Sequence, residues 1–158
     1  MNYLHVDNDI QSKLQHTNNA ILVLYVGFFD ISRDDGKSIN EREFIRALLK
    51  NSSINAVYIG PKTKKEIKIP RSKIISLGYL NRSIRSQIIF QIRLVVLLIQ
   101  INKKFNGKIV ICTRPNYSAI FPALYAKIFN KSLIVKYAGL SVPLIQKRRD
   151  LPRIYRII

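Results

Sequence analysis

The chain has 158 residues, 47% of them hydrophobic, and a formal net charge of +18 at pH 7. A chain of this size and apolar content can bury one core, so a single domain is expected. Cys112 is the only cysteine, which excludes a disulfide framework and favours a reducing compartment. His5 and His16 both lie in a polar amino-terminal stretch, so the sequence holds no Cys/His cluster and no metal site is predicted.

The positive charge is concentrated in one part of the chain. Residues 1–43 hold four Lys and Arg against seven Asp and Glu, a net charge of −3. Residues 44–158 hold 23 Lys and Arg against two acids, a net charge of +21. A field of that sign attracts anionic partners such as nucleotide sugars, nucleic acids or acidic lipids, and it does not choose between them.

The amino-terminal residues 1–19 are polar and show no sustained apolar period. They contain no apolar segment of the kind that a secretory signal needs. We expect them to form a loosely docked arm and the protein to be cytoplasmic.

The first half of the chain predicts a strand, a helix and a second strand. The strands are the apolar runs ILVLYVGFF at 21–29 and INAVYIG at 54–60. Between them, EREFIRALLK at 41–50 has a helical apolar stripe, and Ser38 or Asn40 is a suitable amino-terminal cap. The strands of such a βαβ unit are parallel.

A basic segment and a long helix follow. Residues 61–73 contain six cations and one acid and lead to a short strand at 74–77. Residues 82–104 have a helical pattern whose apolar core, 88–101, contains a cation and is too short to cross a membrane. The cations of this helix fall on one narrow stripe, which is either a solvated face or a face that meets a phosphate-rich surface: Arg82, Arg85, Arg93, Lys103 and Lys104.

A second βαβ unit is predicted over residues 109–138. The apolar runs at 109–113 and 133–138 are typical of strands that are covered on both faces. Ser118 is the predicted cap of the intervening helix, and Asn130 is its predicted stop. The stripe expected to face the sheet is Ala119, Ile120, Leu124, Ile128 and Phe129.

Together these patterns predict an α/β fold over residues 20–142. We expect an open parallel Rossmann-like sheet in the order 3-2-1-4-5, with helices on both faces. Residues 143–158 are interpreted as a basic tail that begins a missing segment. Because open α/β sheets bind ligands beyond the carboxyl ends of their strands, the loops 30–38, 114–117 and 139–142 should converge on one cleft.

The candidate binding residues lie in these loops. Gly36 and Lys37 either offer the positive end of a helix dipole to a phosphate or belong to an ordinary turn. Arg114 is either a ligand contact or a side chain that is solvated or paired with Asp30 or Asp34. The complete candidate set is Gly36, Lys37, Arg114, Asn116, Tyr117 and Gly139.

The sequence identifies no catalytic residue. Asp30, Asp34, Asp35 and Glu41 offer a choice of general bases, yet acids near the start of a helix are common for electrostatic reasons. Ser118 has no histidine placed to activate it, so it is predicted to cap a helix rather than to act as a nucleophile.

Two stretches of the chain resemble a known family. ILVLYVGFFDISRDDGKSINEREFIRALLK at 21–50 and IVICTRPNYSAIFPALYAKIFNKSLIVKYAGL at 109–140 resemble the amino-terminal domain of family 4 glycosyltransferases of GT-B fold. The second stretch is similar to that family's A-x-x-P-A-L turn and to the link that precedes its next strand. The residues that carry this resemblance are Ala119, Pro122, Ala123, Leu124, Asn130, Lys131, Ser132 and Gly139.

The resemblance implies a retaining transfer of a sugar from a nucleotide-sugar donor to a glycan or lipid-linked acceptor, with no metal ion or other cofactor. In that family the amino-terminal domain supplies the acceptor side and backbone contacts to the donor phosphates. A second Rossmann-like domain holds the nucleotide and usually carries a Glu-x7-Glu pair. The chain would then be the acceptor-side half of a GT-B enzyme, inactive until a carboxyl-terminal glycosyltransferase domain is supplied.

The charge leads to two further expectations. Either the cations are spread around the molecule, or they serve peripheral docking on an anionic cytoplasmic membrane. Such docking would suit a lipid-linked acceptor, and each cation near an acidic leaflet contributes about 1 kcal/mol. A non-catalytic basic module that binds a membrane or nucleic acid is the alternative to an enzyme. Since modules that bind nucleic acid interleave aromatic residues with cations, and 61–73 contains no aromatic residue, no nucleic acid partner is predicted.

Overall fold

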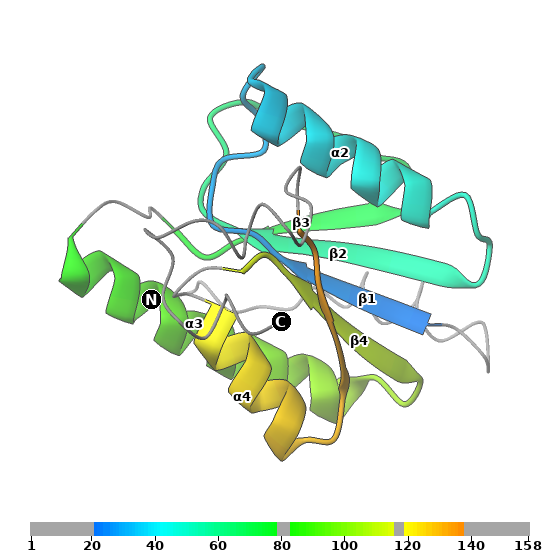
Figure 1. The fold of residues 1–158 in the computed structure, drawn as a ribbon, viewed down its shortest axis with the longest axis vertical. Coiled ribbons are helices and arrows are strands. Elements are labelled where there is room, and N and C mark those ends of the chain that lie inside the picture. Colours follow the sequence, from blue (N-terminus) through cyan, green and yellow to red (C-terminus); the bar gives the residue numbers. More distant parts are fainter. Residues whose placement is uncertain (1–20, 79–82, 116–118, 138–158) are drawn as a thin grey trace, which may run out of the picture.

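The computed structural model describes residues 21–78, 83–115 and 119–137 (Figure 1). They form a five-stranded sheet in the order β3-β2-β1-β4-β5, and every pair of neighbouring strands is parallel. The strands are β1 (Ile21–Val26), β2 (Ile54–Gly60), β3 (Ser72–Ser76), β4 (Lys108–Thr113) and β5 (Ser132–Val135). The helices are α2 (Gly36–Leu48), α3 (Ile84–Lys104) and α4 (Ile120–Ile128). The predicted fold class and strand order are confirmed.

The sheet separates two apolar cores. On one face, Leu22, Leu24 and Val26 of β1 pack with residues of α3 and α4. On the other face, Val23 and Tyr25 of β1 pack with residues of α2. This alternation follows from the period of a strand, whose successive side chains point to opposite faces. Figure 1 shows α2 on one side of the sheet and the pair α3 and α4 on the other, so helices cover both faces as predicted.

Strand β1 ends three residues earlier than predicted. It stops at Val26, and the chain bends at residues 28 and 29. At Gly27 an added side-chain carbon would collide with the ring of Tyr58. The Tyr58 hydroxyl donates to the backbone oxygen of Phe29 at 2.8 Å and so holds the segment after the strand. Apolar residues 28 and 29 therefore belong to a loop at the carboxyl edge, because local hydrophobicity does not distinguish a strand from a packed loop.

Helix α2 begins at Gly36, five residues before the predicted start. The predicted caps Ser38 and Asn40 are wrong, since Asp35 is the cap and its carboxylate accepts from the backbone N–H of Ser38 at 2.8 Å. Ser38 is buried inside the first turn, and its hydroxyl donates to the backbone oxygen of Asp30 at 3.0 Å. The cap was assigned to the wrong residue because several residues of this stretch are chemically able to cap.

The prediction that strand β5 is covered on both faces is wrong. All four of its residues, Ser132–Val135, are exposed, and β5 pairs only with β4 among the described residues. It is therefore an edge strand, although its sequence resembles that of an interior strand. The remaining boundaries differ from the predictions by a few residues, as helix and strand ends commonly do.

Helix α4 packs through a different face from the one predicted. Its buried residues are Pro122, Tyr125 and Ala126, and the Tyr125 hydroxyl donates to the backbone oxygen of Leu98 in α3 at 3.0 Å. The members of the predicted inward stripe on this helix, Ile120, Leu124 and Ile128, are instead exposed. The helix is apolar on nearly every side, so its period alone did not identify the inner face. Asn130 ends the helix region with a φ of 49°, as predicted for a left-handed stop.

Helix α3 is capped by Ser83, whose hydroxyl accepts from the N–H of Ser86 at 3.2 Å. Its inner face, which includes Phe90, Leu94 and Leu98, is part of the core beneath the sheet. By length and composition it is the one helix within the described ranges that could cross a membrane, although a third of its most apolar window is buried against the protein. Packing against the sheet accounts for the apolar residues of this inner face.

Candidate functional site

The strand order defines where a ligand site is expected. The chain runs outward from β1 to β2 and β3, and then returns to place β4 on the other side of β1. In open α/β sheets this reversal opens a crevice beyond the carboxyl ends of the two central strands. The segments that follow β1 and β4 meet there, because the guanidinium of Arg114 lies 5.4 Å from the ring centre of Phe29.

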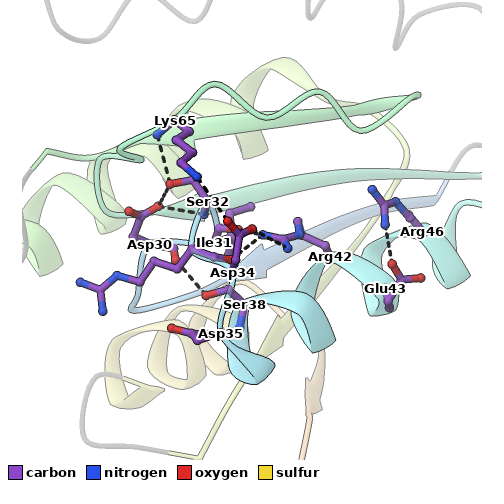
Figure 2. A network of polar contacts seen from close by, with 11 residues as sticks. Asp30, Ile31, Ser32, Asp34, Asp35, Ser38, Arg42, Glu43, Arg46 and Lys65 are labelled. Atoms are coloured by element: carbon purple, nitrogen blue, oxygen red, sulfur yellow. Dashed lines mark hydrogen bonds and ion pairs between the residues drawn. The ribbon is translucent and has the colours of Figure 1, made fainter.

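The loop that follows β1 is organised by Asp30. One oxygen of its carboxylate accepts from the N–H of Ser32 at 2.8 Å and from its hydroxyl at 2.5 Å, as Figure 2 shows. The other oxygen accepts from the N–H of Lys64 at 3.2 Å. Burial opposes ionisation of Asp30, but these hydrogen bonds outweigh it and hold its pKa below the ordinary value. Asp30 therefore ties the loop to the segment after β2 as a carboxylate, and it is poorly suited to take up a proton as a general base.

Asp34 lies on the outer side of the same loop. Its carboxylate is within 3.7 Å of Arg42 and 3.2 Å of Lys65, and Figure 2 shows these cations reaching it from α2 and from the segment after β2. Arg42 also donates to the backbone oxygens of Ile31 and Arg33 at 2.6 and 2.7 Å. The loop is thus held in shape by contacts within the protein.

The amino end of α2 is already occupied by a carboxylate. Hydrogen bonds, the strongest from the Ser38 N–H, lower the pKa of Asp35 and keep it negative at the positive end of the helix dipole. Gly36 and Lys37 are exposed in the first turn, and a side-chain carbon added at Gly36 would meet nothing within 4 Å. A phosphate that binds the backbone here would share the helix end with Asp35.

Arg114 pairs with neither Asp30 nor Asp34. Its guanidinium forms an ion pair with Glu41, whose side chain is fully buried in α2. Lys136, which follows β5, lies 3.4 Å from the same carboxylate oxygen and donates to the side-chain oxygen of Asn40 at 2.8 Å. We call Glu41, Arg114 and Lys136 the buried charge cluster. It joins the carboxyl ends of β4 and β5 to the first turns of α2.

The environment of the buried charge cluster is largely apolar. The Lys136 ammonium lies 4.2 Å from the ring centre of Phe44 and 5.7 Å from that of Tyr25. Burial, and then the nearby charge of Arg114, lower the pKa of Lys136 to about 8. Burial likewise lowers the pKa of Arg114, which stays a cation because it starts from a very high value. Among the described residues, Glu41 Oε2, Arg114 Nε and the Tyr25 hydroxyl have no hydrogen-bond partner.

The cluster has a chemistry that follows from these contacts. It contains two cations and one carboxylate, so it leaves a net positive charge at the switch point of the sheet. A low-dielectric surrounding strengthens the attraction of such a charge for an anionic group. Cys112 lies nearby in β4, but burial raises the pKa of its thiol to about 11, so it is protonated and unreactive at neutral pH.

The structure brings together only some of the predicted site residues. Arg114 lies in the cluster, and Gly36 and Lys37 stand at the start of the helix that carries Glu41. Asn116, Tyr117 and Gly139 lie outside the described residues, as do Ser118 and Arg82. Over the described ranges no group of three His, Cys, Asp or Glu side chains could hold a metal ion.

Sequence reasoning missed the role of Lys136 and treated Glu41 as an ordinary acid at a helix start. A signal was present for Glu41, which is four residues before Ile45 and therefore shares the inward face of the helix. An acid on an inward-facing position predicts a buried partner cation, because an unpaired buried charge is costly. Lys136 gave no comparable signal, because the strand before it is apolar on both faces and Ile134, on the same face as Lys136, is exposed.

A hollow of about 530 Å³ lies elsewhere, beside the edge strand β3. Its lining includes Glu66, Lys68 and Lys73 together with apolar residues of the segment before β3. It is formed by neither of the central strands β1 and β4, and it contains no residue of the buried charge cluster.

No protein-family model matches the chain, and a comparison with curated proteins found no match either. The fold is an open, parallel α/β sheet of Rossmann-like type.

Proposed function

We propose that the chain is the acceptor-side half of a retaining glycosyltransferase of GT-B fold, similar to family 4, that uses a nucleotide sugar and a glycan or lipid-linked acceptor. The observation that supports this most is the meeting of Phe29 and Arg114 at the switch point between β1 and β4. An aromatic ring and a cation are suitable neighbours for a sugar and a phosphate. The resemblance of residues 21–50 and 109–140 to that family is the second support.

The proposed chemistry assigns roles to the cluster. Transfer forms a bond from an acceptor hydroxyl oxygen to the anomeric carbon and breaks the bond from that carbon to a diphosphate oxygen, and the hydroxyl proton passes to the departing diphosphate. Negative charge grows on the departing nucleoside diphosphate, and preorganised cations stabilise such charge. Arg114 and Lys136 would supply that stabilisation, and Glu41 would hold the two cations in place. The nucleotide itself would be held by a second Rossmann-like domain.

Binding can be tested on the chain alone. Amide shifts of the isotopically labelled protein are followed while UDP-glucose, GDP-mannose or a neutral maltooligosaccharide is added. We expect weak, saturable binding, with shifts at residues 28–38, 114 and 136. Lys37→Gln and Arg114→Gln should weaken it several-fold. Lys108→Gln, at the opposite end of β4, is the matched control and should bind as the wild type does.

Transfer is tested by supplying the donor half. The DNA that follows codon 158 is read for a frame that encodes a Rossmann-like domain with a Glu-x7-Glu pair, and that domain is produced together with the chain. Transfer of labelled sugar to lipid or glycan that needs both parts would support the proposal. Shifts confined to the amino edge of the sheet, or equal binding by the Arg114→Gln and Lys108→Gln proteins, would overturn the site.

A further inference from the structure

The outer face of α3 presents an aliphatic ridge to solvent. Ile84, Ile88 and Ile92 are 76%, 53% and 59% exposed, and Val96 continues their four-residue spacing. Residues at that spacing lie above one another on a helix, so the four side chains form one stripe. The stripe is on the side of α3 opposite Phe90 and Leu94, which face the sheet.

Helix α4 repeats the same arrangement beside it. Ile120, Leu124 and Ile128 are exposed at four-residue spacing, opposite the residues that bury against the sheet. The two helices are neighbours on one side of the sheet, as Figure 1 shows and as the hydrogen bond from Tyr125 to Leu98 requires. We call the two stripes together the docking face. Exposed apolar side chains gathered on two neighbouring helices are a mark of an interaction site in soluble proteins.

The charges on these helices have one sign. Helices α3 and α4 contain no Asp or Glu, whereas their cations are Arg85, Arg93, Lys103, Lys104 and Lys127. Helix α2, on the other side of the sheet, mixes Glu41 and Glu43 with its cations. The excess of positive charge that the sequence shows after residue 43 is thus joined, on α3 and α4, to aliphatic side chains.

We propose that the docking face binds the surface of an anionic lipid membrane, with α3 and α4 lying in the plane of the interface. Apolar side chains enter the acyl boundary while cations contact the acidic headgroups, the arrangement that interfacial helices use. Charge complementarity favours this partner over a second copy of the chain, because two copies would bring surfaces of the same positive sign together. The inner face of α3 forms the core, so the helix binds along the membrane and does not cross it.

The chain contains no tryptophan, so the fluorescence of a single introduced tryptophan reports on one position alone. Ile88→Trp places a single indole on the docking face, and Ile39→Trp places one on α2, where Ile39 is 43% exposed. Each protein is mixed with phosphatidylglycerol or phosphatidylcholine vesicles. We expect a blue shift for Ile88→Trp with phosphatidylglycerol, reversed by added salt because screening weakens the headgroup contacts. Ile39→Trp should show no shift.

Co-sedimentation with the same vesicles separates the apolar and the electrostatic parts. The double variant Ile88→Ser/Ile92→Ser should partition about tenfold more weakly than wild type, a change of about 1.4 kcal/mol. Lys103→Glu/Lys104→Glu should weaken binding comparably. Its control, Lys50→Glu/Lys68→Glu, changes the net charge by the same amount with exposed residues outside α3 and α4, and should keep most of the binding.

Three results would overturn the inference. One is equal binding by the Ile88→Ser/Ile92→Ser and Ile39→Ser proteins. Another is equal loss in both pairs of charge variants, which would show that only net charge matters. The third is a dimer, detected by sedimentation equilibrium, that the Ile88→Ser/Ile92→Ser change dissociates, since a second copy would then cover this face. Vesicle binding is measured without a sugar donor, so its failure leaves the proposed transferase function untouched.

Discussion

The buried charge cluster makes a specific prediction about Glu41→Gln. The substitution keeps the shape of the side chain but removes the negative charge that Arg114 and Lys136 share. Breaking a buried ion pair from one side costs about 3–5 kcal/mol, because the remaining charge stays buried without a partner. The Arg114 and Lys136 side chains are 19% and 13% exposed, so water offsets part of this cost. We expect a loss of about 2–3 kcal/mol in the free energy of unfolding.

Urea unfolding followed by far-ultraviolet circular dichroism measures this loss, provided that the denaturant slope is unchanged. The control is Glu43→Gln on the exposed side of the same helix, where Glu43 pairs with Arg46 in solvent. Exposed pairs of this kind contribute little, so its effect should stay within about 0.5 kcal/mol. The double variant Glu41→Gln/Arg114→Gln should be less destabilised than the sum of its single variants. Equal effects of Glu41→Gln and Glu43→Gln would refute the reasoning.

Three further predictions follow from single residues. The pKa of Lys136 falls from its ordinary value to about 8 on folding, so the unfolded chain binds more protons than the folded protein above pH 8. The free energy of unfolding should therefore rise by about 1 kcal/mol between pH 8 and pH 9. Lys136→Met should lack this rise when its free energy of unfolding is measured against pH. Above pH 9 the rise should fade, because the Cys112 thiol then ionises in the unfolded chain. In the folded protein, burial raises its pKa to about 11 and keeps it protonated, so this group favours unfolding as the pH rises. Gly36→Ala should raise the free energy of unfolding by about 0.5–1 kcal/mol, and with it the thermal midpoint, because alanine restricts the unfolded chain and its added carbon meets nothing within 4 Å. A clear loss of stability would show that the first turn is strained. At Asn130, with a φ of 49°, Asn130→Gly should be near neutral in urea unfolding and Asn130→Val should cost about 1–2 kcal/mol; equal midpoints would contradict a left-handed stop there.

The central strands were predictable because burial on both faces leaves a continuous apolar run. Residues 22–26 and 109–112 are buried throughout, and their sequences contain no charged residue. With these runs separated by a helical segment, the rule that crossovers are right-handed and short leaves few strand orders to choose from. The parallel sheet and the meeting of the segments that follow β1 and β4 therefore followed from the sequence, whereas residues 139–142 of the third predicted loop lie outside the described residues.

The inward faces of α4 and β5 were not predictable in this way. Both segments are apolar on nearly all sides, so periodicity carries no information about which side is buried. Their position at the end of the sheet order leaves Leu133, Ile134 and Val135 half exposed, although their sequence is that of an interior strand. Exposure depends on which elements lie next to a segment, and this is a property of the whole fold.

The sequence by itself determined the fold class, the two layers of helices and the presence of Gly36, Lys37 and Arg114 in the segments that follow the central strands β1 and β4. Only the tertiary structure decided that Arg114 pairs with Glu41 and that Lys136 joins them. These residues lie in three segments that are far apart in the chain. Which charges pair depends on the distances between them, and those distances are set by the fold. The exposed aliphatic ridge of α3 could likewise be identified only from the structure, which shows that the opposite side of the helix packs against the sheet.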